Sequence, residues 1–115
     1  MSALITAAEN GDIKELQRLL MKGEDPSAFG NWAIRRAAYN GHHEIVALLL
    51  TDPRVDPTIQ NNYCLQHAIL KGHTEVVRTL KTDGRASHSN FPPEIINSAF
   101  LKGYREIVDL LLGVE

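Results

Sequence analysis

Residues 31–50, NWAIRRAAYNGHHEIVALLL, contain the pattern that decides the fold. Two short segments rich in apolar residues flank Gly41, and two histidines and a glutamate follow it directly. The same frame occurs around Gly11, Gly72 and Gly103, so that successive glycines lie 30, 31 and 31 residues apart. A period near 30 residues indicates stacked helical units.

The segment before each glycine predicts a short helix. Before Gly41 the apolar residues are Ala33, Ile34, Ala37 and Ala38. This spacing places them in one stripe on a helix of about nine residues. A helix this short is not stable alone, so we expect it to pack against its neighbours.

The flanking residues predict how these helices begin and end. We expect Asn31 and Asn62 to act as N-caps of the second and third of them. Pro92 and Pro93 fix the chain direction at the start of the fourth. Each repeated glycine closes its helix by adopting the left-handed backbone conformation, which is costly for a residue with a Cβ.

A second helix follows each glycine. Apolar residues within 45–50 form a broad face, and Glu44 in the first turn interacts favourably with the helix dipole. The stretches between units, such as residues 51–62, are rich in Pro, Asp and Asn and predict irregular loops. No segment alternates long enough to predict a sheet. The sequence therefore predicts an all-α chain.

The repeated frame resembles the ankyrin repeat, whose second helix typically reads G-H-x-E-I-V-x-L-L-L. The segments GHHEIVALLL, GHTEVVRTLK and GYREIVDLLL are similar to it. Two departures are clear: WAIR, YCLQ and EIIN replace the family's T-P-L-H, and each complete unit is two or three residues shorter than the usual 33. These departures predict trimmed, irregular loops in place of long hairpins.

The resemblance implies an ankyrin-repeat solenoid of four stacked helix–turn–helix units. We expect a single domain over residues 1–115, with repeats at 1–31, 32–62, 63–93 and 94–115.

Composition and charge narrow the function classes. The formal net charge of -2 and the mixing of signs predict no nucleic-acid partner. The longest apolar run, within residues 45–50, is too short to cross a bilayer. One cysteine, no N-glycosylation sequon and no leader-like start lead us to expect an intracellular protein, cytoplasmic or nuclear.

His42, His43 and Glu44 are residue types that bind zinc, but their spacing argues against a metal site. Adjacent helical residues point apart, whereas zinc ligands on one helix need a spacing such as i, i+4. The resemblance implies that His42 and His73 are structural and bond the backbone of a neighbouring loop, with Tyr104 in the same position of the last unit. We therefore expect no metal and no cofactor.

Nucleophilic catalysis is not expected either. Cys64 occupies a position of the apolar stripe, whereas His67, three residues on, faces outward. His88 lies in a loop with no evident partner. The glycines are isolated and form no phosphate-binding loop. We predict no catalytic residues and no small-molecule substrate.

The remaining candidate is a protein-binding surface. The resemblance implies that the first helices line a concave groove, into which the positions one, two and five residues before each glycine point. These positions share no residue type, as expected for a scaffold with a custom surface. Phe29 and Phe91 are expected at loop tips beside the groove. The predicted partner-binding residues are Trp32, Arg36, Tyr39, Tyr63, His67, Leu70 and Lys71.

The predicted function is a non-catalytic module that binds another protein through the groove and loop tips. One alternative is that Trp32 and Tyr63 only pack between units. Another is an architectural role, as a self-associating segment of a longer array. Phe100 is a candidate to fold over the open end, but the apolar residues 110–112 still look under-covered. This predicts either a weak C-terminal self-contact or a longer parent chain trimmed at Glu115. A metal- or thiol-dependent enzyme is a distant third.

Overall fold

The computed structural model of the chain describes residues 2–87 and 91–113. Within these residues there are eight α-helices and no strand, which confirms the all-α prediction. The helices are α1 (Ala3–Asn10), α2 (Ile13–Met21), α3 (Ala28–Tyr39), α4 (His43–Leu50), α5 (Ile59–Lys71), α6 (Thr74–Asp83), α7 (Pro93–Leu101) and α8 (Arg105–Leu112).

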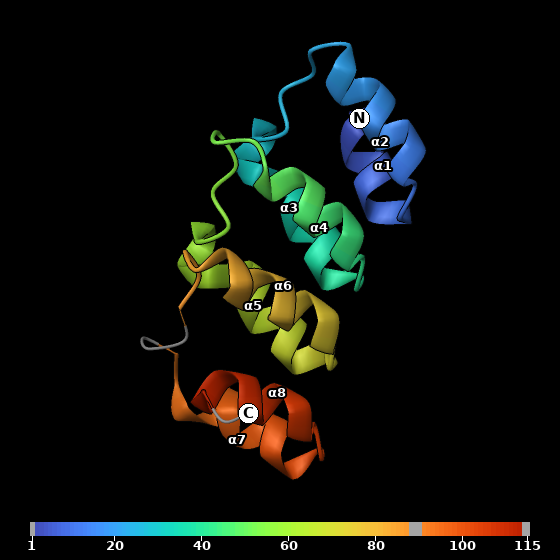
Figure 1. Cartoon of the computed structure of the whole chain (residues 1–115). Helices are drawn as coiled ribbons and strands as arrows, with labels where there is room; N and C mark the ends of the chain where they lie inside the picture. The colour runs from blue at the N-terminus through green and yellow to red at the C-terminus, as the bar shows by residue number, and fades with distance from the viewer. Residues whose placement is uncertain (1, 88–90, 114–115) are drawn as a thin grey trace.

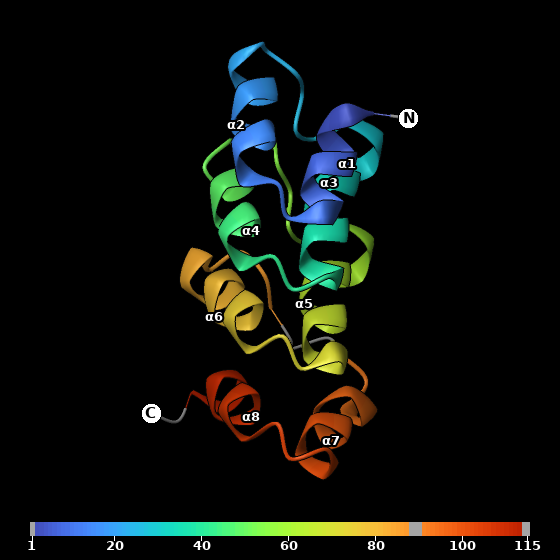
Figure 2. The ribbon, with the colours of Figure 1, turned by 90° about the vertical axis from the view of Figure 1, so that its right-hand side faces the viewer.

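Consecutive helices form antiparallel pairs that stack along one axis into a body of 42 × 25 × 22 Å (Figure 1). Figure 2 shows that α1, α3, α5 and α7 form one row and that α2, α4, α6 and α8 form the other. Each helix contacts its pair mate and the next helix in its own row. The fold is therefore a helical solenoid with two different faces.

The two rows contribute different residues to one continuous core. The first row supplies small side chains such as Ala38 and Ala68, which let neighbouring helices approach closely. The second row supplies Leu49 and Leu80, which are fully buried 31 residues apart. Small residues of the first row and large residues of the second row together form this core. Among the described residues, no helix has the length and apolarity needed to cross a membrane.

The glycine after each first helix adopts the predicted left-handed conformation, with φ of 81° at Gly41 and 74° at Gly72. The structure adds a second reason for glycine at these positions. A Cβ on Gly41 would lie 2.8 Å from Nδ1 of His73, and one on Gly72 would lie 2.8 Å from the ring of Tyr104. Gly11, Gly41 and Gly72 are thus each covered by an aromatic ring from the next helix pair, whereas nothing lies within 4 Å of a Cβ added at Gly103.

The two histidine rings that cover glycines also bond the preceding first helix. Nε2 of His42 donates to the carbonyl oxygen of Glu9 at 3.0 Å, and Nε2 of His73 donates to that of Tyr39 at 2.9 Å. The prediction of structural histidines is therefore correct. The acceptors differ from the expectation, because they lie in the last turn of α1 and α3 and not in a loop.

The predicted N-caps Asn31 and Asn62 are wrong. Asn31 has φ of 60° and is the last of three left-handed residues that begin at Phe29, and Asn62 ends an identical turn that begins at Gln60. Regular helix starts only after each turn. Oδ1 of Asn31 accepts the backbone N–H of Asp56 at 2.9 Å, so this side chain holds the next loop and does not cap its own helix.

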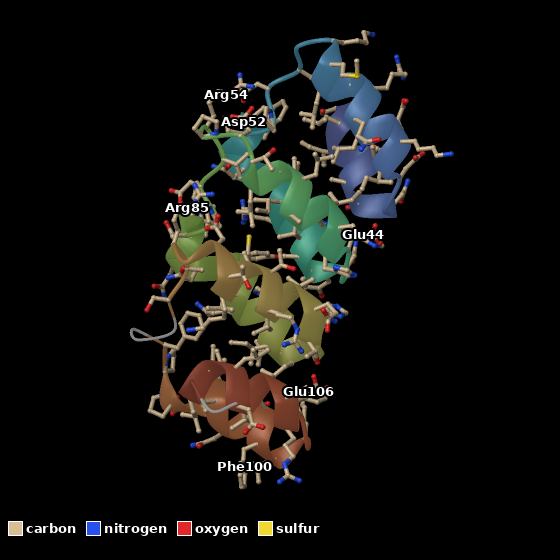
Figure 3. All side chains as sticks on the ribbon, viewed as in Figure 1. Glu44, Asp52, Arg54, Arg85, Phe100 and Glu106 are labelled. Atoms are coloured by element: carbon tan, nitrogen blue, oxygen red, sulfur yellow. The ribbon has the colours of Figure 1, made fainter. Side chains whose placement is uncertain are left out.

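Arginine side chains hold the loops after α4 and α6. Arg54 donates to Asp52 at 2.8 Å, and this hydrogen bond lowers the pKa of Asp52 from 3.8 to about 2. Arg85 pairs in the same way with Asp83 at 2.9 Å and also donates to the carbonyl oxygen of Val55 at 2.8 Å. Figure 3 shows Asp52 and Arg54 together, with Arg85 at the adjacent loop. Side-chain hydrogen bonds therefore hold the described parts of these loops in place.

The last helix pair is less covered than the others. Phe100 is 71% exposed at the far end of the stack, so it does not fold over this end as a cover (Figure 3). Leu111 is buried, contrary to expectation, whereas Leu112 is 62% exposed. Helix α8 therefore buries one stripe against α6 and α7 and leaves an apolar edge in solvent.

Candidate functional site

Aromatic and cationic side chains from α3 and α5 gather on the row of first helices. We call this group the cation–aromatic surface; it consists of Trp32, Arg35, Arg36, Tyr39, Tyr63, His67 and Lys71. Apart from Lys71, which is exposed, all of these residues are partly buried. The stacking of α3 on α5 brings the two sets of side chains together.

Arg35 lies between two aromatic rings. Its guanidinium carbon is 4.5 Å from the ring centroid of Trp32 and 4.6 Å from that of Tyr63. Trp32 precedes it by three residues on the same helix, and Tyr63 belongs to the next pair. Both distances are within the range of cation–π attraction. Arg35 therefore bridges two neighbouring helix pairs.

His67 and Lys71 extend the contacts along α5. The ring of His67 is 4.1 Å from that of Tyr63 and 5.5 Å from that of Tyr39, measured between centroids. Nζ of Lys71 lies 4.7 Å from the Tyr39 centroid, and the guanidinium carbon of Arg36 lies 4.9 Å from it. Tyr39 is thus the ring on which the largest number of side chains of this surface converge.

The surface carries positive charge. Arg36 forms an ion pair with Glu9 of α1 at 2.8 Å, but within the described residues Arg35 and Lys71 have no carboxylate partner. Nε of Arg35 is buried and has no hydrogen-bond partner there. Burial lowers the pKa of His67, and the nearby charges of Lys71 and Arg35 lower it further.

The family model described as ankyrin repeats (3 copies) matches residues 4–90. The chain belongs to the ankyrin repeat family. The match counts three copies where we predicted four repeats, and α7 and α8 lie beyond the matched residues. A search of curated proteins gave no match. Ankyrin repeats are generally protein–protein interaction modules and are typically non-catalytic.

The ankyrin fold brings together six of the seven side chains predicted to bind a partner. Leu70 is the exception, because it packs against the core. Trp32 belongs to the surface and also contacts the core, so its packing role and its binding role are compatible. Phe29 is 73% exposed, but Phe91 is buried, so its expected place at a loop tip is wrong. That these residues bind a partner stays a prediction.

Arg35 is the residue of this surface that sequence reasoning missed. It lies six residues before Gly41, outside the positions that the ankyrin resemblance assigns to the groove. One signal was available: Arg35 follows Trp32 at a helical spacing of i, i+3, which brings the two side chains to one face. Its second ring, Tyr63, could not be inferred from helical spacing.

The side chains considered for catalysis or metal binding are not arranged for either role in the described part of the chain. Cys64 is fully buried in the core, and this burial raises the pKa of its thiol to about 12. The thiol is therefore protonated at neutral pH and is no nucleophile. In residues 2–87 and 91–113, no group of three or more His, Cys, Asp and Glu side chains could hold a metal ion. His88 lies outside the described residues.

Proposed function

We propose that this ankyrin-repeat chain binds a partner protein through the row of α1, α3, α5 and α7, with the cation–aromatic surface as the centre of the contact. The observation that carries the proposal is the convergence of Trp, Tyr and Arg side chains from two neighbouring helix pairs. These residue types most often dominate binding energy at protein interfaces. The expected concave groove, and the loop tip at the exposed Phe29, belong to the same proposal.

The opposite row is a less suitable contact surface. On α6, Arg78 pairs with Glu75 at 3.4 Å and with Glu106 of α8 at 3.1 Å. Exposed ion pairs of this kind contribute little to stability and offer no aromatic anchor. We therefore infer that the second helices mainly support the first row.

The test compares partner capture by variants of the two rows. The double change Trp32→Ala with Tyr39→Ala should weaken capture by at least ~2 kcal/mol, roughly 30-fold in affinity, because each removes a central aromatic anchor. Arg78→Glu on the second row should leave capture nearly intact. If Arg78→Glu abolishes capture and the folded aromatic variant keeps it, the proposal is wrong.

Trp32 needs a separate control because it also contacts the core. Lys71→Ala removes an exposed side chain of the same surface and should leave the melting temperature unchanged. If this variant captures the partner more weakly at unchanged stability, the loss comes from a missing contact with the partner and not from a destabilised helix stack.

A second candidate function is self-association through the last helix pair. Three apolar side chains there are strongly exposed: Phe100 at 71%, Leu101 at 83% and Leu112 at 62%. A light-scattering mass that rises with concentration and returns to the monomer in Phe100→Glu supports this candidate. A monomeric mass at all concentrations contradicts it. We place either function inside the cell, because the single cysteine is an unpaired buried thiol.

A further inference from the structure

Positive charge is segregated on the two central first helices. The segments 28–39 and 59–71, which are α3 and α5, contain no Asp or Glu, but they carry Arg35, Arg36 and Lys71. The whole chain has 14 acidic and 12 basic residues, so its acidic side chains are concentrated elsewhere. Glu9 neutralises only Arg36. The cation–aromatic surface is thus a local positive site on a chain with net negative charge.

Arg35 is oriented to receive a planar anion. Its guanidinium is held near the rings of Trp32 and Tyr63, 4.5 and 4.6 Å from the two centroids, which restricts its rotation. Within the described residues it has no ion pair, and its side chain is partly exposed. Its Nε is buried, so the terminal nitrogens of the guanidinium are the donors for a ligand. An arginine that is pre-oriented and unpaired suits bidentate hydrogen bonding to a carboxylate.

Lys71 offers a second cation on the neighbouring helix. It is exposed and lies over Tyr39, with Nζ 4.7 Å from the ring centroid. Axes of packed helices lie about 10 Å apart. Lys71 directly precedes Gly72, whereas Arg35 lies six residues before Gly41, so the two positions are also offset by five residues, about 7.5 Å, along the stacked helices. An extended peptide covers the resulting distance of about 12–13 Å with about four residues. Two carboxylates a few residues apart could therefore engage Arg35 and Lys71 together.

We propose that the cation–aromatic surface binds a short, extended acidic segment of a partner protein, with one carboxylate on Arg35 and a second on Lys71. This inference rests on the proposed function and names the chemistry of the partner. A single-stranded nucleic acid is the competing anion, but it needs open ring faces for base stacking. Here a cation already lies over Trp32, Tyr39 and Tyr63.

The test uses a short fluorescent glutamate-rich peptide, the same peptide with glutamine at every glutamate, and a short single-stranded RNA. Fluorescence anisotropy should show binding of the acidic peptide only. Arg35→Gln and Lys71→Gln should each weaken it about tenfold, the effect typical of one lost charge-assisted hydrogen bond. Lys14→Gln removes an exposed cation from the other row and is the matched control; it should change little.

Arg35→Lys guards against an effect on folding, because it keeps the charge but loses the planar fork. Its melting temperature is measured alongside, because Arg35 also joins two helix pairs. At a temperature where the variant is folded, it should still bind the peptide more weakly. A peptide carboxylate bound beside Arg35 and Lys71 also partly cancels the repulsion that their positive charges exert on protonated His67. The pKa of His67, followed by NMR, should therefore rise when the peptide binds and stay constant with the glutamine peptide.

Three results would overturn the inference: equal affinity for the glutamine peptide, equal loss with Lys14→Gln, or tighter binding of the RNA that is lost with the same variants. Absence of peptide binding at millimolar concentration would also overturn it. If capture of a natural partner still depends on Tyr39 in that case, the proposed function stands and only the acidic chemistry fails. If capture is also insensitive to Tyr39, both are wrong.

Discussion

The contact between Gly41 and the ring of His73 permits a quantitative test. Gly41→Ala places a Cβ 2.8 Å from Nδ1 of His73, in addition to the strain of an L-residue at φ of 81°. The strain costs about 1–2 kcal/mol. Displacing His73 also removes its hydrogen bond to the Tyr39 carbonyl, which contributes about 1 kcal/mol. The expected total is about 2–3 kcal/mol.

Gly84→Ala is the control for backbone strain alone. Gly84 ends α6 with φ of 88°, and nothing lies within 4 Å of a Cβ added there. Urea unfolding should therefore give a loss about 1 kcal/mol smaller than that of Gly41→Ala. In a His73→Ala background, the double-mutant cycle should reduce the cost of Gly41→Ala to that of Gly84→Ala. Equal losses for both glycines in the natural background would refute the ring-contact argument.

Three further predictions concern other parts of the chain. Asn31→Ala should lower the free energy of unfolding by about 1–3 kcal/mol, because the Asp56 N–H loses its acceptor and φ of 60° disfavours alanine. If Asn31→Gly destabilises the chain as much as Asn31→Ala in thermal unfolding, backbone strain at this position is not part of the cost. The Cys64 thiol should resist alkylation in the folded chain at neutral pH and react once urea unfolds it, as followed by mass spectrometry; rapid labelling of folded protein would contradict its burial. The pKa of Asp52 is lower in the folded state, so the Asp52 carboxylate stabilises the fold above its ordinary pKa of 3.8, and this stabilisation is lost as the pH falls toward about 2. The difference in urea midpoint between the natural chain and Asp52→Asn should therefore shrink over that pH range. A difference that stays constant would be inconsistent with the Arg54 contact.

The parts of the fold that could be predicted from sequence are those set by local chemistry. The spacing of Ala37 and Ala38 before Gly41 predicts a helix that ends in a left-handed glycine. The structure confirms both the helix and the left-handed conformation of Gly41. Local chemistry also sets the start of α2, where the side chain of Asp12, a residue type favoured as an N-cap, accepts the Glu15 N–H at 3.2 Å.

The errors arose where one residue type suits two local roles or where the partner is distant in sequence. Asparagine is favoured both as an N-cap and in the left-handed region of backbone conformation. The sequence around Asn31 does not show that its Oδ1 accepts the backbone N–H of Asp56, 25 residues later. The position of Arg35 depends on Tyr63 of the next pair, and hence on stacking. The candidate surface was thus predicted in outline, but its central cation was not.

The regular separation of the histidine bonds has a consequence for how the chain gains and loses structure. The bonds from His42 and His73 span 33 and 34 residues, and each joins adjacent helix pairs. Contacts of this range require no long loop to close, so any two neighbouring pairs can serve as a folding nucleus. Stability is then a sum of nearest-neighbour terms. A destabilising substitution near Gly11 should speed amide hydrogen exchange in the first helix pair, while α5 and α6 keep their protection. The central pairs can therefore keep the shape of the candidate surface even when an end of the stack unfolds locally.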